Sequence, residues 1–163
     1  MTHLEAHFKA IYHENHPKVY RMCMGYASGD HMLASDFAQE VFIKVWEHLP
    51  SFRNDASIST WIYRITVNTC LVSLRKKRSI PLSKIMSTDE VRTPENETHN
   101  TENNFKALYH CIDLLSKDNK SIILLELEGI PQKEIASIMG ISHEAIRIRV
   151  HRIKNELTKC VQK

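Results

Sequence analysis

Basic side chains gather near the C-terminal end of the chain, at spacings that suit contact with nucleic acid. From Pro131 to Lys163 there are seven lysines and arginines against three acidic residues, an excess of four where the whole chain carries +3. Guanidinium groups grip phosphates or pair with guanine edges in the major groove of DNA. Charge concentrated in this way is typical of a DNA-binding surface, although a helix can carry such residues merely as a solvated face. The candidates are Arg147, Arg149, Arg152 and Lys154.

Two short helices are predicted to position these side chains. Apolar residues in 135–139 give the first helix one buried face, and Gly140 supplies the positive φ of a sharp turn. Ser142 is a suitable N-cap for the second helix, in which Ile146, Val150 and Ile153 recur at helical spacing. The basic residues then lie on the solvent-facing sides. This arrangement is a helix-turn-helix with a basic second helix, which fits the major groove.

The histidines and cysteines do not form a recognisable catalytic or metal-binding set. Cys23, Cys70, Cys111 and Cys160 lie far apart without a CxxC pair, so we expect free thiols in a reducing cytosol. His13 and His16 are three residues apart, but no third ligand is near them. A hydrolase would also need a nucleophile and base at a suitable spacing. We therefore expect no metal, no cofactor, no small-molecule substrate and no enzymatic activity.

Composition predicts an all-α globular protein. The 163 residues are 42% hydrophobic and 25% charged, with only four glycines and five prolines, and the apolar spacing is helical nearly throughout. No apolar run approaches the roughly twenty residues of a membrane helix, and the N-terminus lacks the apolar core of a signal peptide. We expect a cytoplasmic protein without direct membrane insertion.

The N-terminal part is predicted to begin with two helices. The first runs from Leu4 to about Ala27, broken or bent at Pro17, and the second from about Leu33 to His48. The outer face of the second helix carries carboxylates around an exposed isoleucine, which suits either plain solvation or docking against a basic protein helix. The residues of this stripe are Asp36, Gln39, Glu40, Ile43 and Glu47.

A polar loop and a third helix follow. The loop covers 51–57, where Asp55 or Ser57 could cap the next helix, and that helix ends in a basic run beginning at Arg75. Trp61 is predicted to face inward, whereas Tyr63 and Asn68 stay partly outside. The rings and charges suit either a core with a solvated helix end or a site for single-stranded DNA, in which bases stack on aromatic rings.

An acidic segment divides the chain. Residues 87–104 hold five acidic residues, one basic residue and almost nothing apolar, which is typical of a flexible linker. We predict an N-terminal domain of residues 1–80, a linker of residues 81–104 and a C-terminal domain of residues 105–163, each domain with its own core.

The two halves together resemble a known family. ASDFAQEVFIKVWEHLPSF (34–52) and STWIYRITVNTCLVSLRKKR (59–78) are similar to the second region of the sigma-70 superfamily of bacterial transcription initiation factors. LSKDNKSIILLELEGIPQKEIASIMGISHEAIRIRVHRIKNEL (115–157) is similar to its fourth region. The short linker between them is typical of the extracytoplasmic-function (ECF) group.

The resemblance implies a sigma factor that binds core RNA polymerase, directs it to particular promoters and assists promoter melting. The acidic stripe would contact the β′ clamp helices and the fourth region the β flap, with an anti-sigma factor as a further partner. The −10 element would be bound by Arg53, Asn54, Asp55, Thr60, Trp61, Tyr63, Arg64, Asn68, Arg75 and Lys76. The −35 element would be bound by Ser142, His143, Glu144, Arg147, Arg149, Arg152 and Lys154.

This chain departs from the family pattern at positions near the predicted DNA contacts. Ala145 stands where the family usually has threonine, and Ile148 replaces a frequent serine.

An alternative function is a homodimeric helix-turn-helix repressor that does not act through polymerase. Such a repressor needs a self-complementary apolar interface, and it would leave the acidic stripe unexplained.

Overall fold

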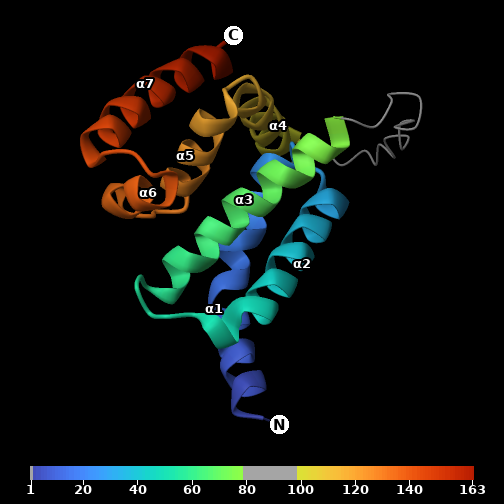
Figure 1. Ribbon diagram of the computed structural model, residues 1–163. Coiled ribbons are helices and arrows are strands. Elements are labelled where there is room, and N and C mark those ends of the chain that lie inside the picture. Colours follow the sequence, from blue (N-terminus) through green and yellow to red (C-terminus); the bar gives the residue numbers. More distant parts are fainter. Residues whose placement is uncertain (1, 79–98) are drawn as a thin grey trace.

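The computed structural model describes residues 2–78 and 99–163, and within these ranges the chain is helical with no β-strand. Figure 1 shows α1, α2 and α3 grouped together, with α4 to α7 packed against one side of this group. The all-α prediction is confirmed. The elements are α1 (His3–Tyr26), α2 (His31–His48), the 3-10 turn η1 (Leu49–Ser51), α3 (Ile58–Arg78), α4 (His99–Asp113), α5 (Lys117–Leu127), α6 (Gln132–Met139) and α7 (His143–Val161).

Local side-chain caps define where the N-terminal helices begin. Thr2 and Glu5 form a capping box at the start of α1, and the Asp30 carboxylate accepts hydrogen bonds from the first backbone amides of α2. At α3 the cap is Ser57, whose Oγ accepts from the Thr60 amide at 3.1 Å. Pro17 lies inside α1 without breaking it, because tertiary packing along α1 outweighs the one backbone hydrogen bond that proline removes.

The helix-turn-helix has the predicted local geometry. Gly140 ends α6 with a left-handed φ of 72°, and the Ser142 hydroxyl caps α7 by accepting from the Ala145 amide at 3.1 Å. Upstream, α4 begins at His99, before the predicted start near Phe105. The last residues of the predicted linker therefore belong to a helix, while its residues 81–98 lie outside the described ranges.

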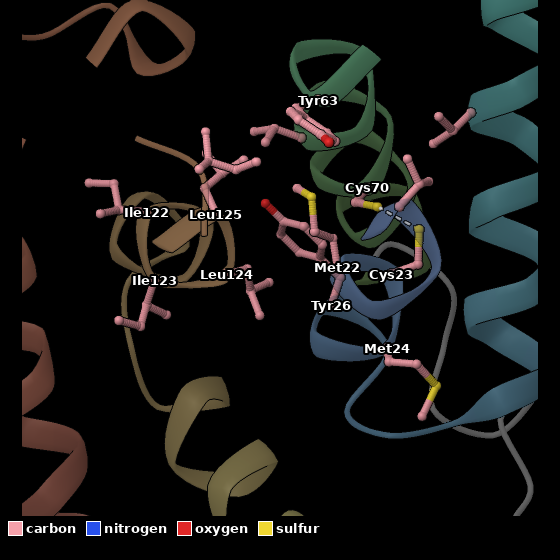
Figure 2. Close-up of a cluster of buried hydrophobic side chains, with 14 of the residues drawn as sticks. Met22, Cys23, Met24, Tyr26, Tyr63, Cys70, Ile122, Ile123, Leu124 and Leu125 are labelled. Atoms are coloured by element: carbon pink, nitrogen blue, oxygen red, sulfur yellow. Dashed lines mark hydrogen bonds between the residues drawn. The ribbon is translucent and has the colours of Figure 1, made fainter. Parts of the chain in front are cut away.

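The two halves share one core, so the expectation of two separate cores is wrong. The buried residues of α1 to α3 and of α4 to α7 form a single cluster. Figure 2 shows Met22 and Tyr26 of α1 facing Leu124 and Leu125 of α5. At the closest approach, a Cβ on Gly25 would come within 2.2 Å of a Leu124 methyl carbon. Only glycine lets these helices approach so closely.

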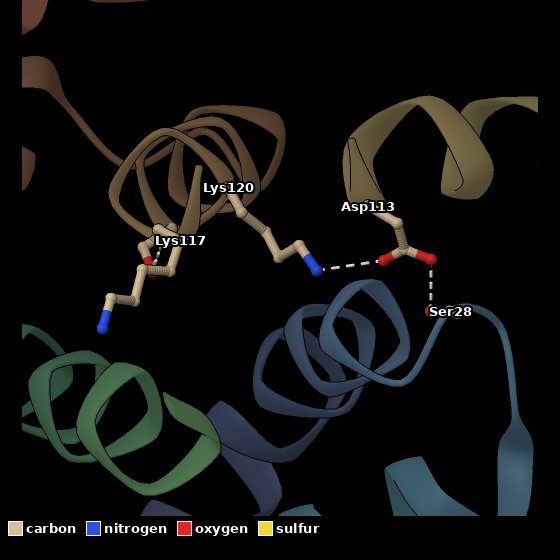
Figure 3. A network of polar contacts seen from close by, with 5 residues as sticks. Ser28, Asp113, Lys117 and Lys120 are labelled. Carbon is tan, nitrogen blue, oxygen red and sulfur yellow. Dashed lines mark hydrogen bonds and ion pairs between the residues drawn. The ribbon is translucent and has the colours of Figure 1, made fainter. Parts of the chain in front are cut away.

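Polar contacts reinforce this junction at the C-terminal end of α1. The Tyr26 hydroxyl donates to the Ser121 Oγ at 2.5 Å inside the core. Figure 3 shows Asp113 of α4 placed between Ser28 and Lys120, accepting from the Ser28 hydroxyl and pairing with the Lys120 ammonium at 3.0 Å. The buried Tyr26 hydroxyl and the buried Lys120 ammonium are therefore both paired at this junction.

The four cysteines form two close pairs. Cys111 on α4 and Cys160 on α7 are joined by a disulfide bond, so the prediction of free thiols is wrong for this pair. Cys23 and Cys70 are free and buried, with their sulfur atoms 3.8 Å apart. Their mutual hydrogen bond and burial raise the pKa of Cys70. Packing alone brought these residues together, since 49 positions separate the disulfide partners along the chain.

Candidate nucleic-acid interface

The outer face of α7 is exposed and basic, as the sequence predicted. Ile146, Val150, Ile153 and Leu157 hold the helix to the core, and the predicted contact residues lie away from them. The exposed residues are His143, Glu144, Arg147, Arg149, Arg152 and Lys154, with the exposed cap Ser142 at their N-terminal end. A helix anchored along one side and basic along the others can enter a DNA groove.

Two of these basic residues have acidic partners within the protein. The Lys154 ammonium lies 3.2 Å from the Glu126 carboxylate on α5, and this pair ties α7 to the helix beneath it. Arg147 lies 3.9 Å from Glu144, one turn earlier on α7, and both side chains are well exposed. The Arg147–Glu144 contact is therefore weak and open to exchange for a phosphate.

The loop before α3 presents polar groups beside an aromatic pair. Arg53, Asn54 and Asp55 are exposed, and Asn54 has a left-handed φ of 59°. Phe52 packs against Trp61 with ring centroids 4.8 Å apart, and both rings are partly exposed. These two rings and the adjoining polar loop supply the types of group that hold unstacked bases.

The predicted contact residues on α3 are not all accessible. Thr60 is buried and donates to the Glu134 carboxylate of α6 at 3.2 Å. Arg64 donates to both the backbone carbonyl and the hydroxyl of Ser137, each at 3.3 Å. Helix α6 therefore occupies this part of α3 in the described arrangement, as the proximity of the two helices in Figure 1 shows.

Tyr63 is also buried, contrary to the prediction that it stays partly outside. It lies in the same buried cluster as Leu125 of α5, as Figure 2 shows. Burial raises the pKa of Tyr63, and the nearby Glu128 carboxylate acts in the same direction. Asn68, Arg75 and Lys76 are exposed along the rest of α3.

The acidic stripe on α2 is on the surface, as predicted. Asp36, Gln39 and Glu47 are exposed, and the Ile43 side chain is 50% exposed. Glu40 is more restrained, because it accepts from the Ser73 hydroxyl of α3 at 3.2 Å and lies 3.8 Å from Lys44. The stripe thus combines solvated carboxylates with the exposed apolar side chain of Ile43, which a docking partner can cover.

An aromatic groove borders this stripe, and the sequence reasoning did not identify it. Its volume is about 590 Å³, and Gln39, Ile43 and Glu47 form part of its wall. The Tyr12 and Phe42 rings in its lining pack against each other, with centroids 4.7 Å apart. A helical period was available as a signal, since four of its rings are four residues apart on α1. The ring-bearing lining residues are Phe8, Tyr12, His16, Tyr20, Phe42 and Trp46.

The fold brings some predicted sites together and separates others. The start of α3 lies against α6, the first helix of the helix-turn-helix, whereas the α2 stripe lies outside this contact.

Within the described ranges, no three histidine, cysteine or acidic residues form a group that could hold a metal ion. No described helix is both long and apolar enough to span a bilayer.

Comparison with protein families matches both halves of the chain. Residues 11–80 match the model of Sigma-70 region 2, and residues 105–157 match Sigma-70, region 4. The second match contains α6, the turn at Gly140 and α7 as far as Leu157. A chain with these two regions in this order is a protein of the sigma-70 class.

Curated relatives define the group more narrowly. The chain is 34% identical over 140 residues to the ECF RNA polymerase sigma-E factor of Haemophilus influenzae, covering 78% of this chain and 74% of that protein. It is 33% identical over 147 residues to the Escherichia coli (strain K12) sigma-E factor, covering 83% and 75%. RNA polymerase sigma factor SigZ of Bacillus subtilis is 31% identical over 139 residues, covering 82% and 75%. The chain belongs to the ECF group of the sigma-70 family.

Solved structures share the fold. The sigma factor RpoE in complex with the anti-sigma factor NepR from Bartonella quintana superposes with a TM-score of 0.74 at 22% identity, covering 95% of this chain and 96% of that chain. CnrH in complex with the cytosolic domain of CnrY gives a TM-score of 0.71 at 16% identity, covering 97% and 89%.

Proposed function

We propose that this chain binds core RNA polymerase, directs it to specific promoters and assists strand separation at the start of transcription. The observation that carries the proposal is the presence of both sigma-70 regions in one chain, the second of which presents a basic recognition helix. Curated relatives above 30% identity are named as RNA polymerase sigma factors. The chain would act in the cytoplasm, where polymerase and promoter DNA meet.

The polymerase contact is assigned to the outer face of α2. Asp36, Gln39 and Glu47 offer charge and hydrogen bonds around the exposed Ile43, a pattern that fits a basic helix with an apolar stripe. This partner would be the β′ clamp helices of the polymerase, with Glu40 as a further contact. The second half, α4 to α7, would contact the β flap.

The promoter contacts are divided between the two halves. Residues on the outer face of α7 would bind the closed −35 duplex, from Ser142 at its cap to Lys154. The loop 53–55 and α3 would hold unstacked bases of the −10 element, with Arg75 and Lys76 near phosphates. Capture of extruded bases would offset an unstacking cost of a few kcal/mol, on the order of what proteins that flip bases overcome.

The −10 role requires the two halves to separate. Thr60 and Arg64 are hydrogen-bonded to α6, so DNA can reach them only after α6 has left α3. Each of the two solved structures described above contains a second protein, which is the anti-sigma factor NepR in one and the cytosolic domain of CnrY in the other. We therefore include a protein of the anti-sigma class among the partners of this chain.

A homodimeric repressor is not favoured, because the region 2 match has no role in that function.

Run-off transcription tests the proposal directly. Core RNA polymerase purified free of sigma factors is mixed with this chain and a library of genomic fragments, and the transcript starts are sequenced. Defined starts that depend on the chain are expected, whereas core polymerase alone should give none above background. The absence of any chain-dependent start would refute the proposed function.

A matched pair of variants separates duplex binding from polymerase binding. Arg147→Ala with Arg149→Ala should reduce promoter-dependent starts by at least about tenfold while the protein still co-elutes with polymerase. Lys159→Ala, an exposed position nearer the end of α7, should leave the starts unchanged. Undiminished transcription by the double variant would remove Arg147 and Arg149 from the proposed contact.

A further inference from the structure

An isoleucine occupies the centre of the outward face of the recognition helix. Ile148 is 43% exposed on α7, although its neighbours Arg147 and Arg149 are charged. Successive helical residues turn by roughly 100°, so Ile148 lies almost opposite the line of Ile146 and Val150 that anchors α7. Its side chain therefore has no role in holding α7 to the protein.

The two flanking arginines lie on opposite sides of this isoleucine. By the same helical geometry, Arg147 is about a quarter turn from the buried face in one direction and Arg149 about a quarter turn in the other. A helix that enters the major groove points its centre at the base edges and its two shoulders at the phosphate strands. At these three positions the helix thus offers guanidinium groups to the phosphates and an alkyl group to the bases.

Isoleucine cannot hydrogen-bond to a base edge, so the chemistry of its contact is restricted. In the major groove, the C5-methyl group of thymine is the apolar feature of the base edges. Burying Ile148 against that methyl group removes two apolar surfaces from water. A cytosine or a guanine at the same place would leave a polar edge facing the alkyl side chain.

We infer that Ile148 is a specificity-determining residue that contacts the C5-methyl group of one thymine in the upstream promoter element. This inference rests on the proposed function, because it assumes that α7 reads a duplex. The contact made by Ile148 adds a base preference. Arg147 and Arg149 do not provide this preference, because they are placed toward the phosphates.

Replacing thymine by deoxyuridine tests the contact, because the two bases differ only in the C5-methyl group. The preferred upstream duplex is first selected from a randomised pool by the complex of this chain with core polymerase. Each thymine is then replaced singly by deoxyuridine, and the affinity of the complex is measured. One replacement should weaken binding about fourfold, which is the factor for about 0.8 kcal/mol per buried apolar carbon.

The variants tie that loss to Ile148. Ile148→Ala should bind the thymine and deoxyuridine duplexes equally, whereas Ile148→Val, which keeps a branched apolar surface, should retain the difference. Val161→Ala, at a 40% exposed position near the end of the same helix, should behave like the unaltered protein. Circular dichroism on the variants checks that each is folded.

Two outcomes separate this inference from the proposed function. If a preferred duplex is selected but no deoxyuridine replacement weakens binding, or if the loss persists in Ile148→Ala, Ile148 does not read thymine and only the inference falls. If the complex selects no sequence and starts transcription nowhere, the proposed function falls and the inference falls with it.

Discussion

The buried side chain of Tyr26 contributes one of the contacts between the two halves of the protein. It is 1% exposed, belongs to α1, and donates its hydroxyl hydrogen to Ser121 of α5. Burial raises the pKa of Tyr26 above its ordinary value, and burial has the same effect on Tyr63 and Tyr109. At pH values at which the tyrosines of the unfolded chain lose their protons, the folded protein therefore keeps these phenols protonated.

This difference predicts a loss of stability in alkaline solution. In the unfolded chain a tyrosine releases its proton near pH 10. Above that pH the unfolded state binds fewer protons than the folded state, so the free energy of unfolding falls as pH rises, and below that pH the effect is absent. Urea unfolding at pH 8 and pH 10.5 should show the decrease.

Tyr26→Phe isolates the contribution of this residue. At pH 8 the variant should lose about 1 kcal/mol, the usual value of one hydrogen bond. Between pH 8 and pH 10.5 its stability should fall less than that of the unaltered protein, because one raised pKa is gone. Tyr12→Phe, at an exposed position, serves as the control. Equal alkaline losses in Tyr26→Phe and the unaltered protein would contradict the argument.

At the scale of elements, α2 serves the core and the surface with different faces. Phe37, Val41 and Val45 are buried, while Asp36 and Glu47 are exposed. Glu47 also lines the aromatic groove. Since the exposed carboxylates have no packing role, their charge can be reversed without removing a buried group. The outer face can therefore be altered separately from the fold.

Reversing that charge should weaken polymerase binding. Asp36→Lys with Glu47→Lys places two ammonium groups where the proposed partner is basic, so affinity for core polymerase should fall at least about tenfold. Co-elution or fluorescence anisotropy with labelled protein measures the change, and the helical circular dichroism should be unaffected. The control is Glu14→Lys, at an exposed position of α1. Unchanged affinity in the double variant would remove the α2 stripe from the interface.

At the scale of the whole molecule, the packing of the two halves covers part of the candidate DNA surface. An ion pair at the edge of this junction joins Arg21 of α1 to Glu128, which follows α5, at 2.9 Å. Both carboxylate oxygens accept from the Arg21 Nε, and this hydrogen bonding to Glu128 raises the pKa of Arg21. Glu128 is mostly buried in this contact, so leaving it unpaired costs more than losing an exposed pair.

Charge reversal at this pair should loosen the packed arrangement. Arg21→Glu places a carboxylate beside Glu128, and the radius of gyration from small-angle scattering should increase as the halves separate. The double variant Arg21→Glu with Glu128→Arg restores an opposite pair and should recover the compact value, with a coupling of about 1 kcal/mol. Lys9→Glu makes the same charge change at an exposed position and should have no effect. If Arg21→Glu stays as compact as Lys9→Glu, the ion pair does not hold the halves together.

Sequence alone determined the features that depend on neighbours a few residues apart. The helical periods of α2, α5 and α7, the turn at Gly140 and the cap at Ser142 follow from side-chain spacing and backbone preference, which act locally. The basic outer face of α7 and the acidic stripe of α2 followed from the same periods. These surfaces could be predicted because a helix fixes which residues share a face.

Only the tertiary structure decided which of these faces meet. The contacts of Thr60 and Arg64 with α6, the burial of Tyr63, the shared core and the Cys111–Cys160 bond join residues far apart along the chain. Helical periodicity shows which residues share a face of one helix. It does not show which other helix that face contacts. The free energy that selects the partner comes from burying apolar surface between distant helices, and that depends on the packing of the whole chain.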